Sequence, residues 1–172
     1  EPAAPAGPRQ RVTTARGTQI ETAFEIVDAA NLVTSDNPAF PPELQPRERG
    51  SRKASTIQVA EMAGQLDPQR LGASPEADRG APIVGPDNIV ESGNGRLMAI
   101  RQAYAAQSDR AQAYRQYIEQ LTGQSTEGMT APVLVRRRLT DVDRRQFVIE
   151  ANESATARMS AAEQARADAD IL

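Results

Sequence analysis

The turn Gly93-Asn94-Gly95-Arg96 is the segment of this sequence whose residue types best suit chemistry. It follows a predicted strand and precedes a predicted helix. Glycine allows the backbone to take positive φ angles and to approach a ligand closely. The first N–H groups of a helix have no internal partners, and the helix dipole favours an anion beside them. Arg96 could add a bidentate charged contact. The spacing predicts a phosphate-binding cradle, although Gly-x-Gly alone equally fits a plain turn with a solvated Arg96.

Two familiar phosphate-binding motifs do not fit this turn. It lacks the Gly-Lys-Ser/Thr of a Walker A loop, and Met98 stands where a dinucleotide fingerprint has its third glycine. The chain has neither Cys nor His, which excludes thiol chemistry and removes the commonest metal ligand and general base. Any chemistry would therefore use carboxylates, arginine, hydroxyls, amides or a metal that arrives with the ligand. Glu91 and Glu150 are the candidate acid–base residues, and a solvated or arginine-paired Glu91 is the alternative interpretation.

Arginine dominates the positive charge of the chain. Lys53 is the only lysine, although the formal net charge is −3. This preference fits either a GC-rich genome or planar, bidentate recognition of phosphate. The densest positive group contains Arg136, Arg137, Arg138 and Arg144. It predicts contacts with the DNA backbone, and a solvated sheet edge is the alternative.

The elements around these residues predict a mixed α+β domain with a small sheet and surrounding helices. Residues 1–20 are rich in Pro, Ala and Arg, and we expect a flexible linker there and a domain over 21–172. The predicted elements are a strand at 22–27, a helix at 55–66, a hairpin at 82–91, a helix after the Gly93 turn, a helix capped by Ser108, a strand from Pro132, a helix capped by Thr140 or Asp141, and a last helix opening at Ser160. No stretch approaches the length of a membrane span.

Five stretches of the chain occur in an order that is specific to one superfamily. They are Leu44-Gln45-Pro46-Arg47, Arg79 to Val84, Val90 to Arg96, Pro132 to Arg136, and Ala151 to Ser154 with the following Ser160 to Ala165. From roughly Phe24 to Asp170 the chain resembles the ParB/sulfiredoxin superfamily, and closely the DdrB-like ParB domain of large phage and mobile-element proteins.

This resemblance implies a nucleoside triphosphate pocket, for CTP or ATP with Mg²⁺. Its Gly-x-x-Arg box, which holds phosphates at a helix N-terminus, matches Gly93, Asn94, Gly95 and Arg96. The Gln-Pro-Arg loop that covers the pocket matches Gln45 and Arg47, and the Glu-Asn box matches Asn152. The chain departs from the family at two places. Asn94-Gly95 replaces the usual Glu-Arg, and Ala151 replaces the Glu. The cysteine that sulfiredoxins need is absent, which excludes sulfinic acid reduction.

Three functions follow as hypotheses. The first is a nucleotide- or nucleic-acid-phosphate-binding module of a larger phage or mobile-element protein that acts on DNA or protects it from restriction. The second is a metal-dependent nuclease, nucleotide hydrolase or phosphotransferase. The third is an interaction module with a degenerate pocket. We expect nucleotide, DNA and further domains of the same polypeptide as partners, with a homodimer possible, and a cytoplasmic or virion-packaged location without a membrane contact.

Overall fold

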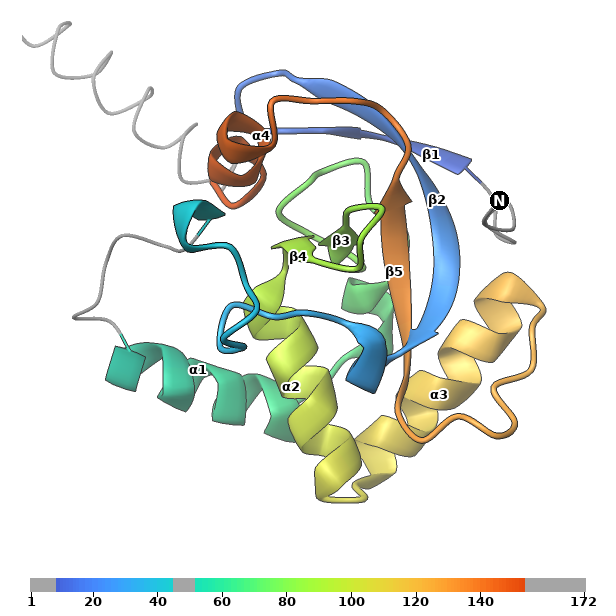
Figure 1. The fold of residues 1–172 in the computed structure, drawn as a ribbon. Coiled ribbons are helices and arrows are strands. Elements are labelled where there is room, and N and C mark those ends of the chain that lie inside the picture. Colours follow the sequence, from blue (N-terminus) through green and yellow to red (C-terminus); the bar gives the residue numbers. More distant parts are fainter. Residues whose placement is uncertain (1–8, 45–51, 154–172) are drawn as a thin grey trace, which may run out of the picture.

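A five-stranded mixed sheet forms the centre of the described part of the molecule (Figure 1). The computed structural model describes residues 9–44 and 52–153. The strand order is β1-β2-β5-β3-β4. The strands are β1 (Arg9–Thr13), β2 (Gln19–Asp28), β3 (Ile83–Val84), β4 (Val90–Ser92) and β5 (Pro132–Arg138). Neighbours are antiparallel except β3 and β5, which are parallel.

In these two ranges, four α-helices surround the sheet. They are α1 (Arg52–Gly64), α2 (Asn94–Ala105), α3 (Asp109–Thr122) and α4 (Arg144–Ala151). Short 3-10 helices occur there as well: η1 (Ala29–Asn31), η2 (Pro42–Leu44) and η3 (Pro68–Leu71). Figure 1 shows α1, α2 and α3 together at one end of the molecule and α4 at the other end. The helix that follows the Gly93 turn is thus α2, which packs between α1 and α3.

The main core lies between the sheet and the helices α2 and α3. Leu97 and Ile100 of α2 and Tyr114 and Ile118 of α3 are fully buried and contact the sheet core around Val135. Their spacing of three or four residues places each pair on one helix face, as the periodicity of the sequence predicts. The buried helix face fixes the direction of α2, so the N-terminus of α2 is held at the end of β4.

Most of the predicted elements are present, and the fold class is confirmed as α+β. The 82–91 segment forms the antiparallel hairpin of β3 and β4. Ser108 caps α3 through a bond from the Ala111 N–H to its Oγ at 3.1 Å. The helix expected at 55–66 begins earlier, at Arg52, and ends at Gly64. The helix expected at Ser160 lies outside the described residues.

Two of the predicted boundaries are wrong. Residues 9–20 do not form a linker, because they contain β1 and the first residues of β2, and Val12 and Ile20 are buried there. Buried apolar residues at alternate positions stabilise a strand despite the polar composition around them. The cap of α4 is Asp143, which accepts a bond from the Gln146 N–H, rather than Thr140 or Asp141.

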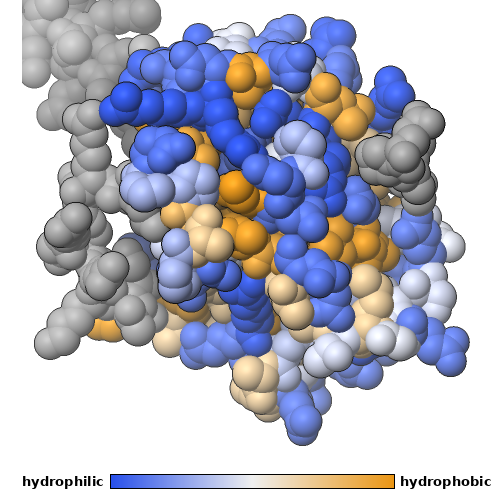
Figure 2. All heavy atoms as spheres, viewed as in Figure 1, coloured by the Kyte–Doolittle hydropathy of each residue, from blue (hydrophilic) through white to orange (hydrophobic). Residues whose placement is uncertain are grey.

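The surface in Figure 2 is mixed, with hydrophobic residues interspersed among hydrophilic ones. Within residues 9–44 and 52–153, no helix is long and apolar enough to cross a bilayer.

Candidate functional site

The turn at Gly93 has two backbone features that the sequence predicts, a positive φ angle and a position at the start of a helix. Gly93 has a φ of 93°, in the left-handed region that glycine adopts without strain, and it is the N-cap of α2. No side chain caps this end, and the first intrahelical bond joins the Leu97 N–H to the Gly93 carbonyl at 2.9 Å. The N–H groups of Asn94, Gly95 and Arg96 precede this bond. A β-carbon placed on Gly95 would have no atom within 4 Å, so the space beside the first turn is open.

Arg96 folds back against this turn. A β-carbon on Gly93 would lie 2.8 Å from Arg96 Nη2, so glycine at this position makes room for the guanidinium. Arg96 Nη1 donates to the Asp78 carbonyl at 2.7 Å. Its Nε and Nη2 are buried and have no hydrogen-bond partner within the described part of the chain. Burial lowers the pKa of Arg96 to about 10, and the nearby Asp78 opposes this shift.

Neighbouring segments hold the turn in place. Ser92 Oγ lies within hydrogen-bond distance of the carbonyls of Ala77, at 3.0 Å, and Ala151, at 2.9 Å. The Ser35 N–H donates to Asn94 Oδ1 at 2.8 Å, which attaches the segment after β2 to the helix start. Asn152 Nδ2 donates to the Glu91 carbonyl at 2.9 Å. The Asn152 side chain therefore braces β4 against α4.

A cleft of about 1000 Å³ adjoins Arg96. It is lined by α1, η3, the segment from Ala73 to Gly80, and Arg96 itself. Gln45 and Arg47, the residues expected to cover the pocket, lie outside the described residues. No group of three acidic residues in the described ranges could hold a metal ion. The site thus offers N–H donors and a guanidinium, which suit an anion.

Glu91 is paired with arginines, which is the alternative interpretation given to it from the sequence, and its acid–base role stays a prediction. Glu91 is completely buried and accepts bonds from Arg138 at 2.7 and 3.0 Å and from Arg144 at 2.7 Å. Arg144 also pairs with Asp87, and these contacts lower the pKa of Asp87 and raise that of Arg144. The carboxylate of Glu91 is therefore held by two guanidinium groups.

Glu150 is likewise held by structural contacts. It accepts bonds from Thr18 at 2.6 Å, Thr14 at 2.9 Å and Gln146 at 3.0 Å. The Thr18 and Gln146 bonds contribute most to the lowering of its pKa. These partners connect α4 to the turn between β1 and β2. Glu91 and Glu150 share no partner in the described ranges, so the structure does not bring them together as a catalytic pair.

The arginines of the predicted DNA-binding group all bind other protein groups, although Arg144 keeps 28% of its side chain exposed. Arg136 is fully buried, which excludes the contact with DNA predicted for it. Arg137 binds Glu25 at 3.0 Å and also the Gly85 carbonyl at 2.7 Å. Arg138 and Arg144 bind Glu91 as described above. Strand pairing supplies acceptors to these side chains from segments distant in sequence, so the positive run of the sequence is a set of internal contacts.

Sequence reasoning did not predict three contacts of the site, although it names Arg136 as a DNA-binding residue. They are made by Ser92, which braces the turn, by the Asp78 carbonyl, which orients Arg96, and by Arg136, which binds the loop containing Asp78. A serine next to a glycine turn and an arginine inside an apolar strand are the only signals in the sequence. Neither signal identifies a partner about 15 to 60 residues away.

Comparison with known proteins identifies one family. The ddrB-like ParB superfamily domain matches residues 15–139, which span the chain from the β1–β2 turn through β5 and include the Gly93 turn. The match starts before Phe24 and ends before α4, so Glu150 and Asn152 lie beyond it. Neither the curated proteins nor the solved structures give a match. The family match covers well over half of the chain. The chain therefore belongs to the family of ddrB-like ParB superfamily domains.

Proposed function

We propose that this domain binds a phosphate group of a nucleotide or nucleic acid at the N-terminus of α2. The observation that supports this most directly is the state of Arg96. A guanidinium has five N–H donors. Within the described chain, Nη1 of Arg96 donates to one acceptor, the Asp78 carbonyl. Its Nε and Nη2 are buried and have no acceptor there. These groups lie beside the uncapped first turn of α2.

The electrostatics of the turn favour an anion. A buried charge without a partner is costly, because its hydration is lost and nothing replaces it. Nε and Nη2 of Arg96 have no acceptor in the described chain, and burial lowers the pKa of this guanidinium. The positive end of the α2 dipole adds to this field. A phosphate oxygen at the turn would accept from the N–H groups of Gly95 and Arg96 and would offset the guanidinium charge.

The proposed activity is binding and not catalysis. Glu91 and Glu150, the carboxylates considered for catalysis, are occupied by structural contacts. Mg²⁺ would have to arrive with the triphosphate, because the described residues contain no cluster of acids to hold it. A triphosphate such as CTP or ATP would extend past Arg96, which lines the cleft, into the space beside α1.

Calorimetry tests this proposal. CTP, ATP and inorganic phosphate are titrated into the full chain with and without Mg²⁺. We expect binding by the wild type and a loss of affinity of about tenfold or more in Arg96→Ala, since a charged hydrogen bond contributes about 1.5–3 kcal/mol. Arg11→Ala is the matched control: Arg11 is exposed on β1, the opposite edge of the sheet from β4. Equal affinity of wild type and Arg96→Ala would contradict the proposal.

The wider role proposed for the domain is that of a DNA-directed module within a larger phage or mobile-element protein, with an anti-restriction function. The family membership supports a ParB-type module in general. A short DNA duplex and a single strand are therefore further titrants in the same experiment. The cytoplasm or a virion is the location that this role implies, and a homodimer is detectable by light scattering in the same samples.

A further inference from the structure

Arg136 is the most completely bonded side chain beside the proposed site. Its Nε donates to the Ala81 carbonyl at 2.7 Å, and Nη1 donates to the carbonyls of Ser74 at 2.8 Å and Glu76 at 3.0 Å. Its Nη2 lies against the carbonyls of Ala77 and Arg79. All five N–H donors of this guanidinium therefore have acceptors, and every acceptor belongs to the segment from Ser74 to Ala81. We call this segment the 74–81 loop.

The 74–81 loop also holds Arg96. Its Asp78 carbonyl accepts from Arg96 Nη1, and its neighbours Ala77 and Arg79 accept from Arg136. We propose that Arg136 is a positioning residue for the anion site: by holding the 74–81 loop through five carbonyls, it fixes the Asp78 carbonyl and, through it, the direction of the Arg96 guanidinium. This inference rests on the proposed function at Arg96.

The loop needs such a contact because it contains no helix or strand. Gly80 has a φ of 80°, and a β-carbon there would lie 2.7 Å from the Gly72 carbonyl. The carbonyls of the loop point inward, where an unpaired carbonyl would lose its hydration. Lysine could not replace Arg136, because an ammonium group has three donors and lacks the planar fork of a guanidinium.

Arg96 and Arg136 are also coupled by charge. Both guanidinium groups are buried, and neither forms a salt bridge in the described chain; Asp78 is the carboxylate that acts on both. Burial and then the repulsion by Arg96 lower the pKa of Arg136 to about 9. An anion at Arg96 would reduce this repulsion. Because coupling between two events is reciprocal, anion binding would stabilise the loop as much as the ordered loop favours binding.

Hydrogen exchange of the loop amides tests the structural half of this inference without any ligand. The N–H groups of Ala77 and Ala81 donate to backbone carbonyls at 3.0 and 2.9 Å and serve as reporters. In Arg136→Lys we expect their exchange to accelerate about tenfold or more, because part of the carbonyl set loses its donor. Arg115→Lys is the matched control, since Arg115 binds the carbonyls of Thr126 and Met129 in a remote loop. Unchanged loop exchange in Arg136→Lys would overturn the inference.

A double-mutant cycle tests whether Arg136 acts through Arg96. The affinity for CTP, or for inorganic phosphate, is measured in wild type, Arg96→Ala, Arg136→Lys and the double variant. We expect Arg136→Lys to weaken binding about tenfold in the wild type and to have no further effect in Arg96→Ala. Additive losses would overturn the positioning role, as they would show that Arg136 acts independently of Arg96.

Two further measurements separate a folding defect from a positioning defect. Gly80→Ala displaces the loop without changing either arginine, so it should weaken binding as Arg136→Lys does; wild-type affinity in a folded Gly80→Ala protein would overturn the inference. In the wild type, the ligand should slow the exchange of Ala77 and Ala81, and an unchanged rate at saturation would also overturn it. Absence of any binding by the wild type would instead refute the proposed function.

Discussion

Replacing Glu91 by Gln tests whether this carboxylate is a structural counter-charge. Glu91 accepts three charged hydrogen bonds, two from Arg138 and one from Arg144, at 2.7–3.0 Å, and it is fully buried. The substitution removes the negative charge and turns an amide N–H₂ toward one of the guanidinium groups. Removal of one partner of a buried ion pair costs about 3–5 kcal/mol. For a chain of this size, this loss corresponds to a decrease in Tm of roughly 6–20 °C.

Thermal and urea unfolding followed by circular dichroism measure this effect. Glu21→Gln is the control, because Glu21 pairs with Arg11 in an exposed bridge at 3.2 Å, and such a bridge contributes at most about 1 kcal/mol. Adding Arg138→Met to Glu91→Gln should recover part of the stability, since it removes the guanidinium left without a counter-charge. A Glu91→Gln protein that melts within the error of the wild type would refute the structural role and would return Glu91 to consideration as a functional carboxylate.

Three further predictions concern the turn, the acid response and the core. Gly93→Ala should cost about 1–3 kcal/mol in unfolding free energy, because alanine is strained at a φ of 93° and its β-carbon would contact Arg96; urea unfolding measures the loss. The pKa of Glu150 is lowered in the folded state, so its contribution is present above the unfolded pKa of about 4.3 and disappears as the pH falls below it. Glu150→Gln should therefore flatten the decrease in stability as the pH falls below about 4.3, and an unchanged slope in acid titrations would contradict this. Tyr114→Phe should cost about 1–3 kcal/mol, because the Leu134 N–H donates to the buried Tyr114 hydroxyl at 2.9 Å and would lose its acceptor; calorimetric melting checks this value.

Local signals in the sequence were sufficient for much of the fold. The hairpin at 82–91, the Ser108 cap and the positive φ of Gly93 each follow from a few adjacent residues, and the structure contains all three. These features depend on backbone conformation and nearest-neighbour bonds, which short segments determine. The helix start without a side-chain cap at Gly93 is of the same kind, and it was predictable for that reason.

The charged residues were predicted poorly because their environment is tertiary. Arg136 and Glu91 have polar types that normally indicate an exposed position, yet both are completely buried. Their partners come from other strands and loops, about 50 to 60 residues away for most contacts. No local pattern distinguishes an arginine that faces solvent from one that binds five carbonyls. The order of the strands in the sheet decides whether such an arginine is buried or exposed. That order cannot be deduced from the local patterns of a single sequence.

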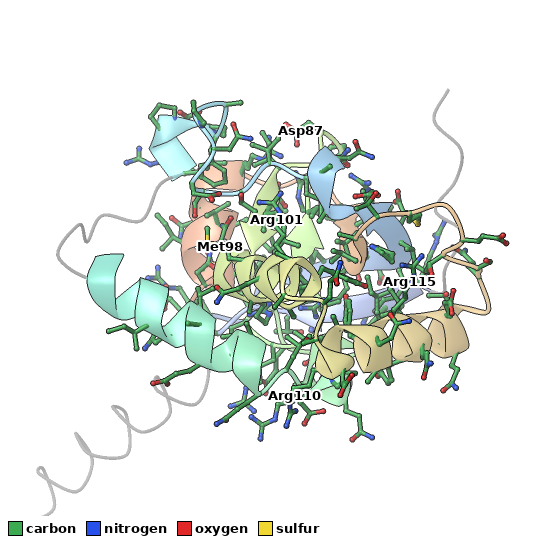
Figure 3. All side chains as sticks on the ribbon, turned by 90° about the horizontal axis from the view of Figure 1, so that it is seen from below. Asp87, Met98, Arg101, Arg110 and Arg115 are labelled. Atoms are coloured by element: carbon green, nitrogen blue, oxygen red, sulfur yellow. The ribbon has the colours of Figure 1, made fainter. Side chains whose placement is uncertain are left out.

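Arginine is used throughout this domain to fasten one segment to another. Figure 3 labels Arg101 on α2 and Arg110 and Arg115 on α3. Arg101 binds the carbonyls of Ala29 and Leu32, and Arg110 binds the Leu66 carbonyl just after the end of α1. Arg115 and Arg136 each bind carbonyls of a single loop, as described above. The arginine preference of the sequence therefore has a structural cause in addition to any effect of genome composition.

Because of these contacts, lysine can replace some arginines of the domain and not others. Drift in genomic base composition exchanges Arg and Lys codons wherever one positive charge serves as well as another. Exposed Arg11 and Arg70 are positions of that kind. Arg101, Arg115 and Arg136 require several donors in a fixed plane, so lysine cannot serve there. In relatives from AT-rich genomes we expect lysine at the first two positions and arginine retained at the other three, and such a pattern would separate structural arginines from compositional ones without an experiment.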